Sequence, residues 1–328
     1  MEASCSDCVR MQLSRMPDRH TITAAAERLA GHVRHTPTMM LPADELPGSG
    51  PVALKLEFLQ HSGSFKARGA FNRLLTATVP AAGVVAASGG NHGAAVAYAA
   101  RQLGHAATIF VPGLTPAAKV ARIRSYGAKV VQGGAAYADA WEACQAHQAS
   151  TGALNVHAYD DPDVVSGQGT VGLELLADAP GVTHVLVSVG GGGLMAGIAA
   201  ALEGSGVRVV GVEPVSCPTL HAALAAGAPV AVEVGGLAAD SLGARTLGNI
   251  GFGIARRTGV ESVLVDDEAI RAAQRWLWER LRIVAEPGGA AALAAVLSSA
   301  WSAPGGSVVA VLLCGANTDP GSVAGAPT

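Results

Sequence analysis

The sequence predicts an α/β fold made of two open, twisted and mostly parallel β-sheets with helices on both faces. Short apolar segments alternate with helical patterns along the chain, which is typical of parallel strands connected by helices. The apolar segments are nearly continuous, as in strands that are buried on both faces of a sheet. The chain has 328 residues, of which 50% are hydrophobic and 14% charged, so it can bury a large core.

The first part of the chain contains three predicted segments. Residues 1–20 are predicted to form an N-terminal tail. A helix is predicted over residues 24–33, with Thr21 before it as a capping residue. Residues 52–58 alternate between apolar and polar side chains, and this period of about two predicts a strand.

Two series of strands and helices follow, and we assign them to two lobes without a flexible linker. The small domain is expected over residues 79–155, and the large domain over residues 21–78 and 156–328. The predicted strands cover residues 84–87, 107–111, 129–132, 184–189, 208–212 and 308–313, and the predicted helices cover residues 91–103, 116–125, 135–150, 167–177, 194–202, 267–282 and 288–300.

Composition and charge exclude several classes of function. A net charge of −3 provides no basic field for nucleic acid. Residues 185–202 are uncharged and long enough to resemble a membrane-spanning helix. The glycines in the middle disfavour one long helix and instead predict a strand, a turn and a helix. Five cysteines do not describe a disulfide scaffold, and the N-terminus lacks the apolar segment of a secretory signal. We therefore expect a cytoplasmic protein with no nucleic-acid or membrane partner.

Lys66 is the lysine whose surroundings indicate chemistry. Ser64 is a candidate N-cap, which would place Lys66 in the first turn of a helix that runs to about Thr76. The positive end of the helix dipole lowers the pKa of such a lysine, and a neutral amine is the nucleophile that forms Schiff bases. The alternative is a surface lysine, as we expect for Lys55, Lys119 and Lys129.

Two glycine-containing loops follow predicted strands. The first, Ser88-Gly-Gly-Asn-His-Gly93, is either a capped turn or a loop whose backbone amides bind an anion such as a carboxylate. The second, Gly190-Gly-Gly-Gly193, precedes a predicted helix and has the form of a phosphate cradle. It also matches a dinucleotide fingerprint, with Glu213 where a ribose-binding acid would lie, so an NAD-dependent oxidoreductase is an alternative from another class.

Cys314 ends the last apolar strand, at the edge where open α/β sheets bind ligands. The alternative is a buried and chemically inert cysteine.

Together these segments resemble the fold-type II pyridoxal-phosphate enzymes of the serine/threonine dehydratase and serine racemase group. The resemblance extends from about residue 21 to residue 317. It is carried by five motifs in the family's order: Ser62-Gly-Ser-Phe-Lys-Ala-Arg-Gly69, Ser88-Gly-Gly-Asn-His-Gly93, Gly190-Gly-Gly-Gly193, Glu286-Pro-Gly-Gly-Ala290 and Cys314-Gly-Ala-Asn317.

The resemblance implies a cofactor, pyridoxal 5'-phosphate, in an active site between the two lobes. Lys66 would form the Schiff base with Phe65 against the ring, and Glu286 would lie near the ring. Asn91 would bind the ring hydroxyl and Cys314 would lie beside the pyridine nitrogen. The phosphate would be held by Gly190, Gly191, Gly192, Gly193 and Leu194, and the substrate by Ser88, Gly89, Asn91, His92 and Ser241.

The implied reaction is the α,β-elimination of a β-hydroxy amino acid, most simply L-threonine or L-serine, to a 2-oxo acid and ammonia. A racemase, or a dehydratase of the hydroxyaspartate or hydroxyectoine pathways, is the alternative on the same scaffold. The racemases carry a serine where this chain has Gly89, and glycine has no proton to give. We therefore expect racemisation to be at most a minor activity.

Two further expectations follow from the resemblance. Glu213 matches a cation-binding glutamate of the family, but Thr219 stands where the magnesium-binding members carry aspartate. The resemblance therefore leaves a monovalent cation, a divalent cation or a weak site open. The family pairs its large domains, so a homodimer or homotetramer is expected. The substrate side chain would lie near Tyr159 and residues 239–246.

Overall fold

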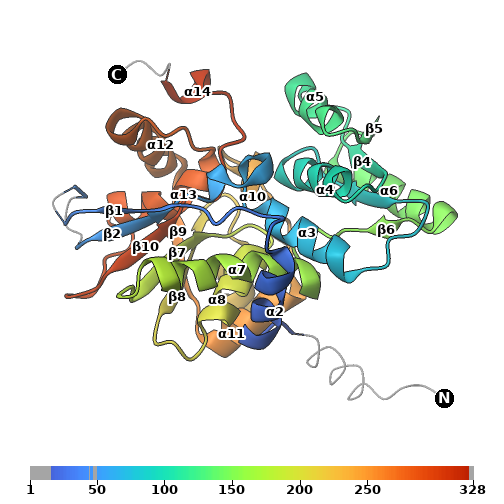
Figure 1. Ribbon diagram of the computed structural model, residues 1–328. Coiled ribbons are helices and arrows are strands. Elements are labelled where there is room, and N and C mark those ends of the chain that lie inside the picture. Colours follow the sequence, from blue (N-terminus) through green and yellow to red (C-terminus); the bar gives the residue numbers. More distant parts are fainter. Residues whose placement is uncertain (1–15, 44, 47–49, 325–328) are drawn as a thin grey trace.

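The computed structural model describes residues 16–43, 45–46 and 50–324, which form two β-sheets flanked by helices (Figure 1). The larger sheet has six strands in the order β1-β2-β10-β7-β8-β9, and the smaller has four in the order β5-β4-β3-β6. The predicted α/β class with mostly parallel sheets is confirmed. Most of the predicted tail lies outside the described residues.

The larger sheet is parallel except at one edge, where β1 runs antiparallel to β2. In the middle of the sheet, β10 pairs with both neighbours, so that Val309 lies beside Val52 and His184. Its strands are β1 (Thr38–Leu41), β2 (Val52–Lys55), β7 (His184–Ser188), β8 (Arg208–Pro214), β9 (Glu261–Val265) and β10 (Val309–Leu312).

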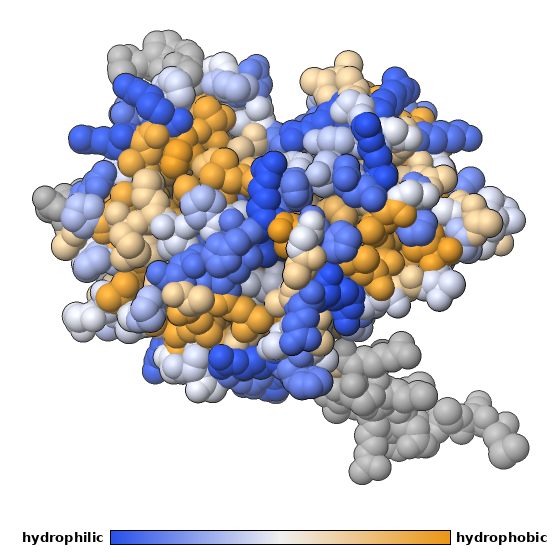
Figure 2. Space-filling view, viewed as in Figure 1, coloured by the Kyte–Doolittle hydropathy of each residue, from blue (hydrophilic) through white to orange (hydrophobic). Residues whose placement is uncertain are grey.

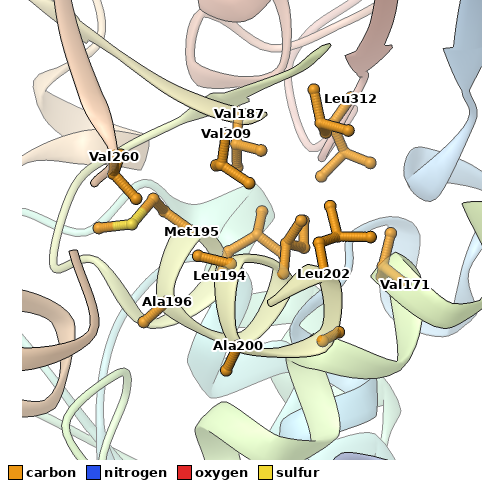
Figure 3. Close-up of a cluster of buried hydrophobic side chains, with 14 of the residues drawn as sticks. Val171, Val187, Leu194, Met195, Ala196, Ala200, Leu202, Val209, Val260 and Leu312 are labelled. Atoms are coloured by element: carbon orange, nitrogen blue, oxygen red, sulfur yellow. The ribbon is translucent and has the colours of Figure 1, made fainter. Parts of the chain in front are cut away.

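Helices cover both faces of the larger sheet and bury two apolar cores. Figure 3 shows one core, in which Val187 and Val209 of the strands lie near Met195 of α8 and Leu312 lies over the other end of the same helix. That face carries α2 (Arg19–Leu29), α7 (Pro162–Asp178), α8 (Gly193–Leu202), α9 (Thr219–Ala226) and α11 (Asn249–Thr258), and the other carries α12 (Asp267–Leu281) and α13 (Pro287–Leu297).

The smaller sheet is parallel and its four strands lie between residues 84 and 155. Its strands are β3 (Val84–Ala87), β4 (Ala107–Val111), β5 (Lys129–Gln132) and β6 (Leu154–Asn155). Its helices are α4 (Asn91–Gln102) and α5 (Ala117–Ser125) on one side and α6 (Tyr137–Thr151) on the other. The linking helix α3 (Lys66–Thr76) packs against both α4 and α7.

Several short elements complete the described chain. Two 3₁₀ turns, Glu57–Leu59 and His61–Gly63, connect β2 to α3. Two four-residue helices, α10 (Ala239–Leu242) and α14 (Gly321–Ala324), lie above the larger sheet in Figure 1. Within the described part of the chain, no helix is long and apolar enough to cross a membrane.

Some predicted boundaries are wrong. Helix α2 begins at Arg19 because Asp18 is its N-cap, and Thr21 is instead the third helical residue that completes the capping box. Helix α7 begins at Pro162, after the N-cap Asp161, rather than near residue 167. Five further elements, β1, β6, β9, α9 and α11, were not predicted from the sequence.

Lys55, which the sequence predicts to be solvated, is fully buried. Its amine lies 2.8 Å from a carboxylate oxygen of Glu174 and 3.0 Å from one of Asp178, and it donates to the Thr36 carbonyl at 2.7 Å. These partners replace water around a buried charge. The period-two pattern of residues 52–58 placed Lys55 on the face expected to be polar. In the structure both faces of β2 are buried.

Candidate active site

Two neighbouring cavities lie between the two halves of the molecule, where Figure 2 shows a notch at the top of the view. The smaller cavity, of about 480 Å³ with its open mouth, lies at the carboxyl ends of β7 and β10. The predicted site residues that line it are Phe65, Lys66, Asn91, Gly190, Gly191, Gly192, Gly193, Leu194, Ser241, Glu286 and Cys314, and Tyr159 lines it as well. The sequence thus identified most of its wall.

Lys66 begins α3 and brings its amine to this cavity. The amine donates a hydrogen bond to the Ala158 carbonyl at 2.7 Å, and burial lowers its pKa to about 8. The predicted cap is wrong, because Phe65 is the N-cap residue and the buried Ser64 hydroxyl has no hydrogen-bond partner. Desolvation is therefore the main reason for the lowered pKa.

The glycine loop connects β7 to the N-terminus of α8. Gly192 has a φ of 87°, a left-handed conformation that favours glycine. A Cβ atom on Gly191 would lie 2.2 Å from the aromatic ring of Tyr159, and one on Gly193 would lie 2.7 Å from the Tyr159 carbonyl oxygen. Only glycines let Tyr159 pack this closely on the loop. The N-terminus of α8 behind it is suited to bind a phosphate.

Asn91 is the first residue of α4, but its side chain does not cap that helix. Its amide nitrogen donates to Glu286 at 2.5 Å, and its amide oxygen accepts from Asn317 at 2.5 Å. Burial raises the pKa of Glu286 to about 7. Two carboxamides and one carboxyl group therefore form a connected row along the cavity wall.

Cys314 follows β10 and is buried. Its thiol lies 3.4 Å from the Gly288 carbonyl oxygen, and burial raises its pKa far above the usual range. The thiol is therefore neutral at physiological pH. A neutral group here can hydrogen-bond a ring nitrogen without supplying a negative charge.

The second cavity, of about 1160 Å³ including its mouth, adjoins the first and shares Asn91 and Glu286 with it. Gly89 lines it, and a Cβ atom on Gly89 would lie 2.8 Å from the Thr115 side chain. The Ser88 hydroxyl accepts a hydrogen bond from the Gly90 backbone at 3.2 Å. This loop thus opens on the larger cavity.

The side chain of His92 does not reach either cavity. Its ring nitrogen lies 2.7 Å from the Val156 carbonyl oxygen, and burial lowers its pKa to about 3. The ring is therefore neutral and its visible role is to join α4 to the end of β6. For binding a substrate carboxylate, His92 therefore offers its backbone amide and not its side chain.

Ser241 in α10 lies where the sequence predicted the side-chain pocket. Its hydroxyl accepts from the Gly288 backbone at 3.0 Å, which joins α10 to the start of α13. A Cβ atom on Gly288 would lie 2.5 Å from this hydroxyl oxygen, so the contact requires glycine.

Glu213 lies outside both cavities and is fully buried. Its carboxylate accepts hydrogen bonds from the Leu220 and His221 backbone at 2.7 and 2.9 Å, and from the Thr219 hydroxyl at 3.0 Å. The oxygens that the sequence assigned to a cation, or to a ribose, are thus taken by protein donors. Among the described residues there is no cluster of three metal-binding side chains.

Some lining residues were not identified from the sequence. Arg122 and Lys119 of α5 line the larger cavity, where they lie near Asp240 of α10, which belongs to the predicted range 239–246. Lys119 and Asp240 form an ion pair across its mouth. Only the folded chain brings these segments together, so no local pattern could indicate them.

The lining fits the cofactor that the resemblance implies. Lys66 supplies an amine for an aldehyde, the glycine loop and α8 supply a phosphate site, and Cys314 supplies a neutral partner for a ring nitrogen. Glu213, by contrast, does not fit a ribose.

Comparisons with known proteins agree with this geometry. The family described as pyridoxal-phosphate dependent enzyme matches residues 29–315. An L-threonine ammonia-lyase of Thermotoga maritima is 40% identical over 82% of this chain and 68% of its own length. Maize serine racemase has a TM-score of 0.88 at 32% identity, covering 94% of this chain and 96% of its own, and a threonine deaminase from T.th. has a TM-score of 0.86 at 39% identity, covering 92% and 99%. This chain belongs to the pyridoxal-phosphate dependent enzymes.

Proposed function

We propose that this enzyme catalyses the elimination of water from a β-hydroxy amino acid, with L-threonine and L-serine as substrates, and releases a 2-oxo acid and ammonia. The observation that carries the proposal is the amine of Lys66 in one cavity with a glycine-rich helix N-terminus and the buried thiol of Cys314. The similarity to proteins named threonine ammonia-lyase and threonine deaminase supports the same reaction.

Lys66 would attach the cofactor and then act as the base. When bound, pyridoxal phosphate supplies an electron sink that acidifies the Cα proton of the attached amino acid. A lysine with a pKa of about 8 is partly neutral at physiological pH, so its amine can accept that proton.

Cys314 favours elimination over a long-lived carbanion. Its neutral thiol does not force protonation of a pyridine nitrogen, as an aspartate would, so the electron sink is weaker. With a weaker sink, rapid loss of the β-hydroxyl is the favoured fate after the Cα proton is removed.

The substrate carboxylate would bind at the loop that contains Ser88 and Asn91. This loop ends at the N-terminus of α4, where backbone N–H groups and the helix dipole attract an anion. Because the loop and Lys66 lie at adjoining cavities, a small amino acid can reach both.

Gly89 favours dehydratase over racemase. Racemisation needs a proton donor on the face of Cα opposite the base, and Gly89 has no side chain to supply it. The Thr115 side chain fills the space that a side chain at position 89 would take. The similarity to maize serine racemase keeps racemisation as the second candidate.

The test is a turnover assay with the purified enzyme and pyridoxal phosphate. L-threonine, L-serine, 3-phenylserine and 3-hydroxyaspartate are offered separately, and 2-oxo acid and ammonia are measured together with the chirality of the remaining substrate. We expect equal amounts of 2-oxo acid and ammonia, and none from Lys66→Ala. Inversion of serine without 2-oxo acid would establish the racemase instead.

The assembly and location are proposed from the sequence. We expect a cytoplasmic homodimer or homotetramer that binds a small amino acid. Size-exclusion chromatography with light scattering measures the mass of the holoenzyme, and a monomer at micromolar concentration would contradict the proposed assembly.

A further inference from the structure

Arg122 is a cationic residue at the larger cavity that the proposed reaction does not use. It lies in α5, on the half of the molecule that contains the smaller sheet, and is half-buried. One guanidinium nitrogen donates to the Ser62 carbonyl at 3.0 Å, and another donates to the amide oxygen of Asn317. Both partners are neutral and belong to segments that flank the active site.

Asn317 connects Arg122 to the active site through further hydrogen bonds. Its amide nitrogen donates to the Ser62 carbonyl at 2.9 Å and to the amide oxygen of Asn91 at 2.5 Å. The amide nitrogen of Asn91 in turn donates to Glu286 at 2.5 Å. The hydrogen bonds therefore run in one direction, from Arg122 through Asn317 and Asn91 to Glu286.

The direction of this relay follows from the chemistry of its first members. A guanidinium can only donate hydrogen bonds, so the Asn317 group that faces Arg122 must be its oxygen. A backbone carbonyl can only accept, so the Ser62 carbonyl holds the Asn317 amide nitrogen on the other side. With both ends of Asn317 assigned, Asn91 must turn its oxygen to Asn317 and its N–H groups to Glu286 and the cavity.

The backbone is shaped for these contacts. Ser62 has a φ of 59°, a left-handed conformation that is uncommon for serine, and its carbonyl accepts from both Arg122 and Asn317. A Cβ atom on Gly63 would lie 2.5 Å from the Asn317 amide oxygen and 3.0 Å from Arg122. A side chain at position 63 would therefore break the first link of the relay.

We propose that Arg122 is a positioning residue that acts through Asn317 to fix the N–H groups of Asn91 toward the cofactor cavity. Because Arg122 lies on the half with the smaller sheet and Asn317 follows β10 of the larger sheet, the relay also makes cofactor binding depend on how the two halves meet. The inference rests on the proposed role of Asn91 toward the cofactor, and not on which amino acid is the substrate.

The test is a cofactor titration of four variants and the wild type, with the visible absorbance spectrum recorded at saturation. Arg122→Met removes the hydrogen-bond donor to Asn317. Arg122→Lys keeps a cation that can donate hydrogen bonds but cannot accept them. Asn317→Asp keeps the shape and still accepts from Arg122, but an ionised carboxylate cannot donate to Asn91. Arg124→Met is the matched control, because Arg124 is exposed on the same helix.

We expect Arg122→Met and Asn317→Asp to bind pyridoxal phosphate about tenfold more weakly, as for the loss of one buried hydrogen bond, and to shift the visible absorbance maximum. Arg122→Lys should recover most of the affinity, and Arg124→Met should match the wild type. The unfolding temperature of Asn317→Asp is measured alongside, because its carboxylate gains an ion pair with Arg122 but faces the Ser62 carbonyl and the Asn91 amide oxygen.

Wild-type affinity and spectrum in Asn317→Asp would overturn the relay, as would a loss in Arg122→Met that Arg124→Met shares. The turnover assay stands apart from this measurement. An enzyme that binds the cofactor but forms no 2-oxo acid would refute the proposed function, while the titration would still decide the relay.

Discussion

The amine of Lys66 lies in an enclosed site, where burial favours its neutral form. It therefore loses its proton at a lower pH than an ordinary lysine does. Burial lowers its pKa from 10.5 to about 8. Attachment of an aldehyde requires the neutral amine, and below the pKa the neutral fraction rises about tenfold for each pH unit. We expect the rate of cofactor uptake by cofactor-free enzyme to rise up to about pH 8 and then level off.

Stopped-flow absorbance after mixing with pyridoxal phosphate measures this uptake. A free lysine derivative under the same conditions is the control, because it corrects for the titration of the aldehyde itself. A rate that still rises steeply between pH 9 and pH 10 would mean that Lys66 keeps an ordinary pKa in the cavity.

Thr219 links the buried Glu213 to the glycine loop. Its hydroxyl lies 2.5 Å from the Gly190 carbonyl and 3.0 Å from the Glu213 carboxylate. Thr219→Val has nearly the same shape but no hydroxyl, so the Gly190 carbonyl loses the donor that lies 2.5 Å away and Glu213 loses a polar neighbour. We expect the free energy of unfolding to fall by about 1–2 kcal/mol, measured by urea denaturation, and cofactor affinity to fall with it.

Thr219→Ser keeps the hydroxyl and is the control for that substitution.

The same contacts predict that a chelator leaves the turnover of the wild-type enzyme unchanged, since protein donors already satisfy Glu213. Loss of turnover in the chelator, with recovery on adding Mg²⁺, would show that a divalent cation displaces these donors.

The glycine loop is the element whose geometry allows the least variation. Gly191→Ala places a methyl group 2.2 Å from a carbon of the Tyr159 ring, so either the ring or the loop must move. We expect cofactor affinity to fall at least about tenfold in an absorbance titration, because a phosphate site depends on the exact position of the loop amides.

Gly181→Ala is the matched control, since a Cβ atom there meets nothing within 4 Å. Gly181 precedes β7, the strand that the glycine loop follows. The double variant Gly191→Ala/Tyr159→Ala removes the clash and should recover part of the affinity. If Gly191→Ala alone binds as the wild type does, the close packing of Tyr159 does not hold the loop.

The sequence predicted elements well where the pattern is local. The strands at residues 84–87, 107–111 and 129–132 match β3, β4 and β5, because each is a short apolar run between turns. Strand β9 was missed because Glu261 and Ser262 interrupt its apolar pattern at the sheet edge. Helix α9 was missed because no side chain caps it from the position directly before it; instead Glu213, six residues before Thr219, accepts from the Leu220 and His221 amides.

The site shows the same division between local and long-range signals. Lys66, the two glycine loops and Cys314 are each marked by their immediate neighbours in the sequence. The Ser64 cap was wrong because Ser64 pairs with Gly315, which is remote in the chain. The relay that begins at Arg122 crosses from one half of the molecule to the other, so only the fold reveals it.

At the scale of the whole molecule, a buried ion cluster holds the Lys66 helix to the larger half. Arg68, on α3, contacts Glu57 at 2.7 and 2.9 Å and Glu174 of α7 at 2.6 and 2.9 Å. Lys55 contacts the same Glu174 at 2.8 Å. The cluster therefore joins the segment after β2, helix α3 and helix α7 around the fully buried charges of Lys55, Glu57 and Arg68.

Removing the central cation should cost a large share of the stability. Arg68→Met has a similar helix propensity, but it leaves Glu57 without its partner inside the protein. We expect the free energy of unfolding to fall by about 3–5 kcal/mol in urea denaturation, as for other broken buried pairs, out of about 5–15 kcal/mol for a typical protein.

Arg73→Met on the same helix separates this effect from the loss of any arginine. Arg73 is partly exposed and contacts Asp161 at 3.1 Å and Asp163 at 3.3 Å, so its removal should cost less than about 1 kcal/mol. Adding Glu57→Gln and Glu174→Gln to Arg68→Met removes the stranded charges and should recover part of the stability. Equal losses for Arg68→Met and Arg73→Met would mean that water reaches the cluster and that it does not hold α3 in place.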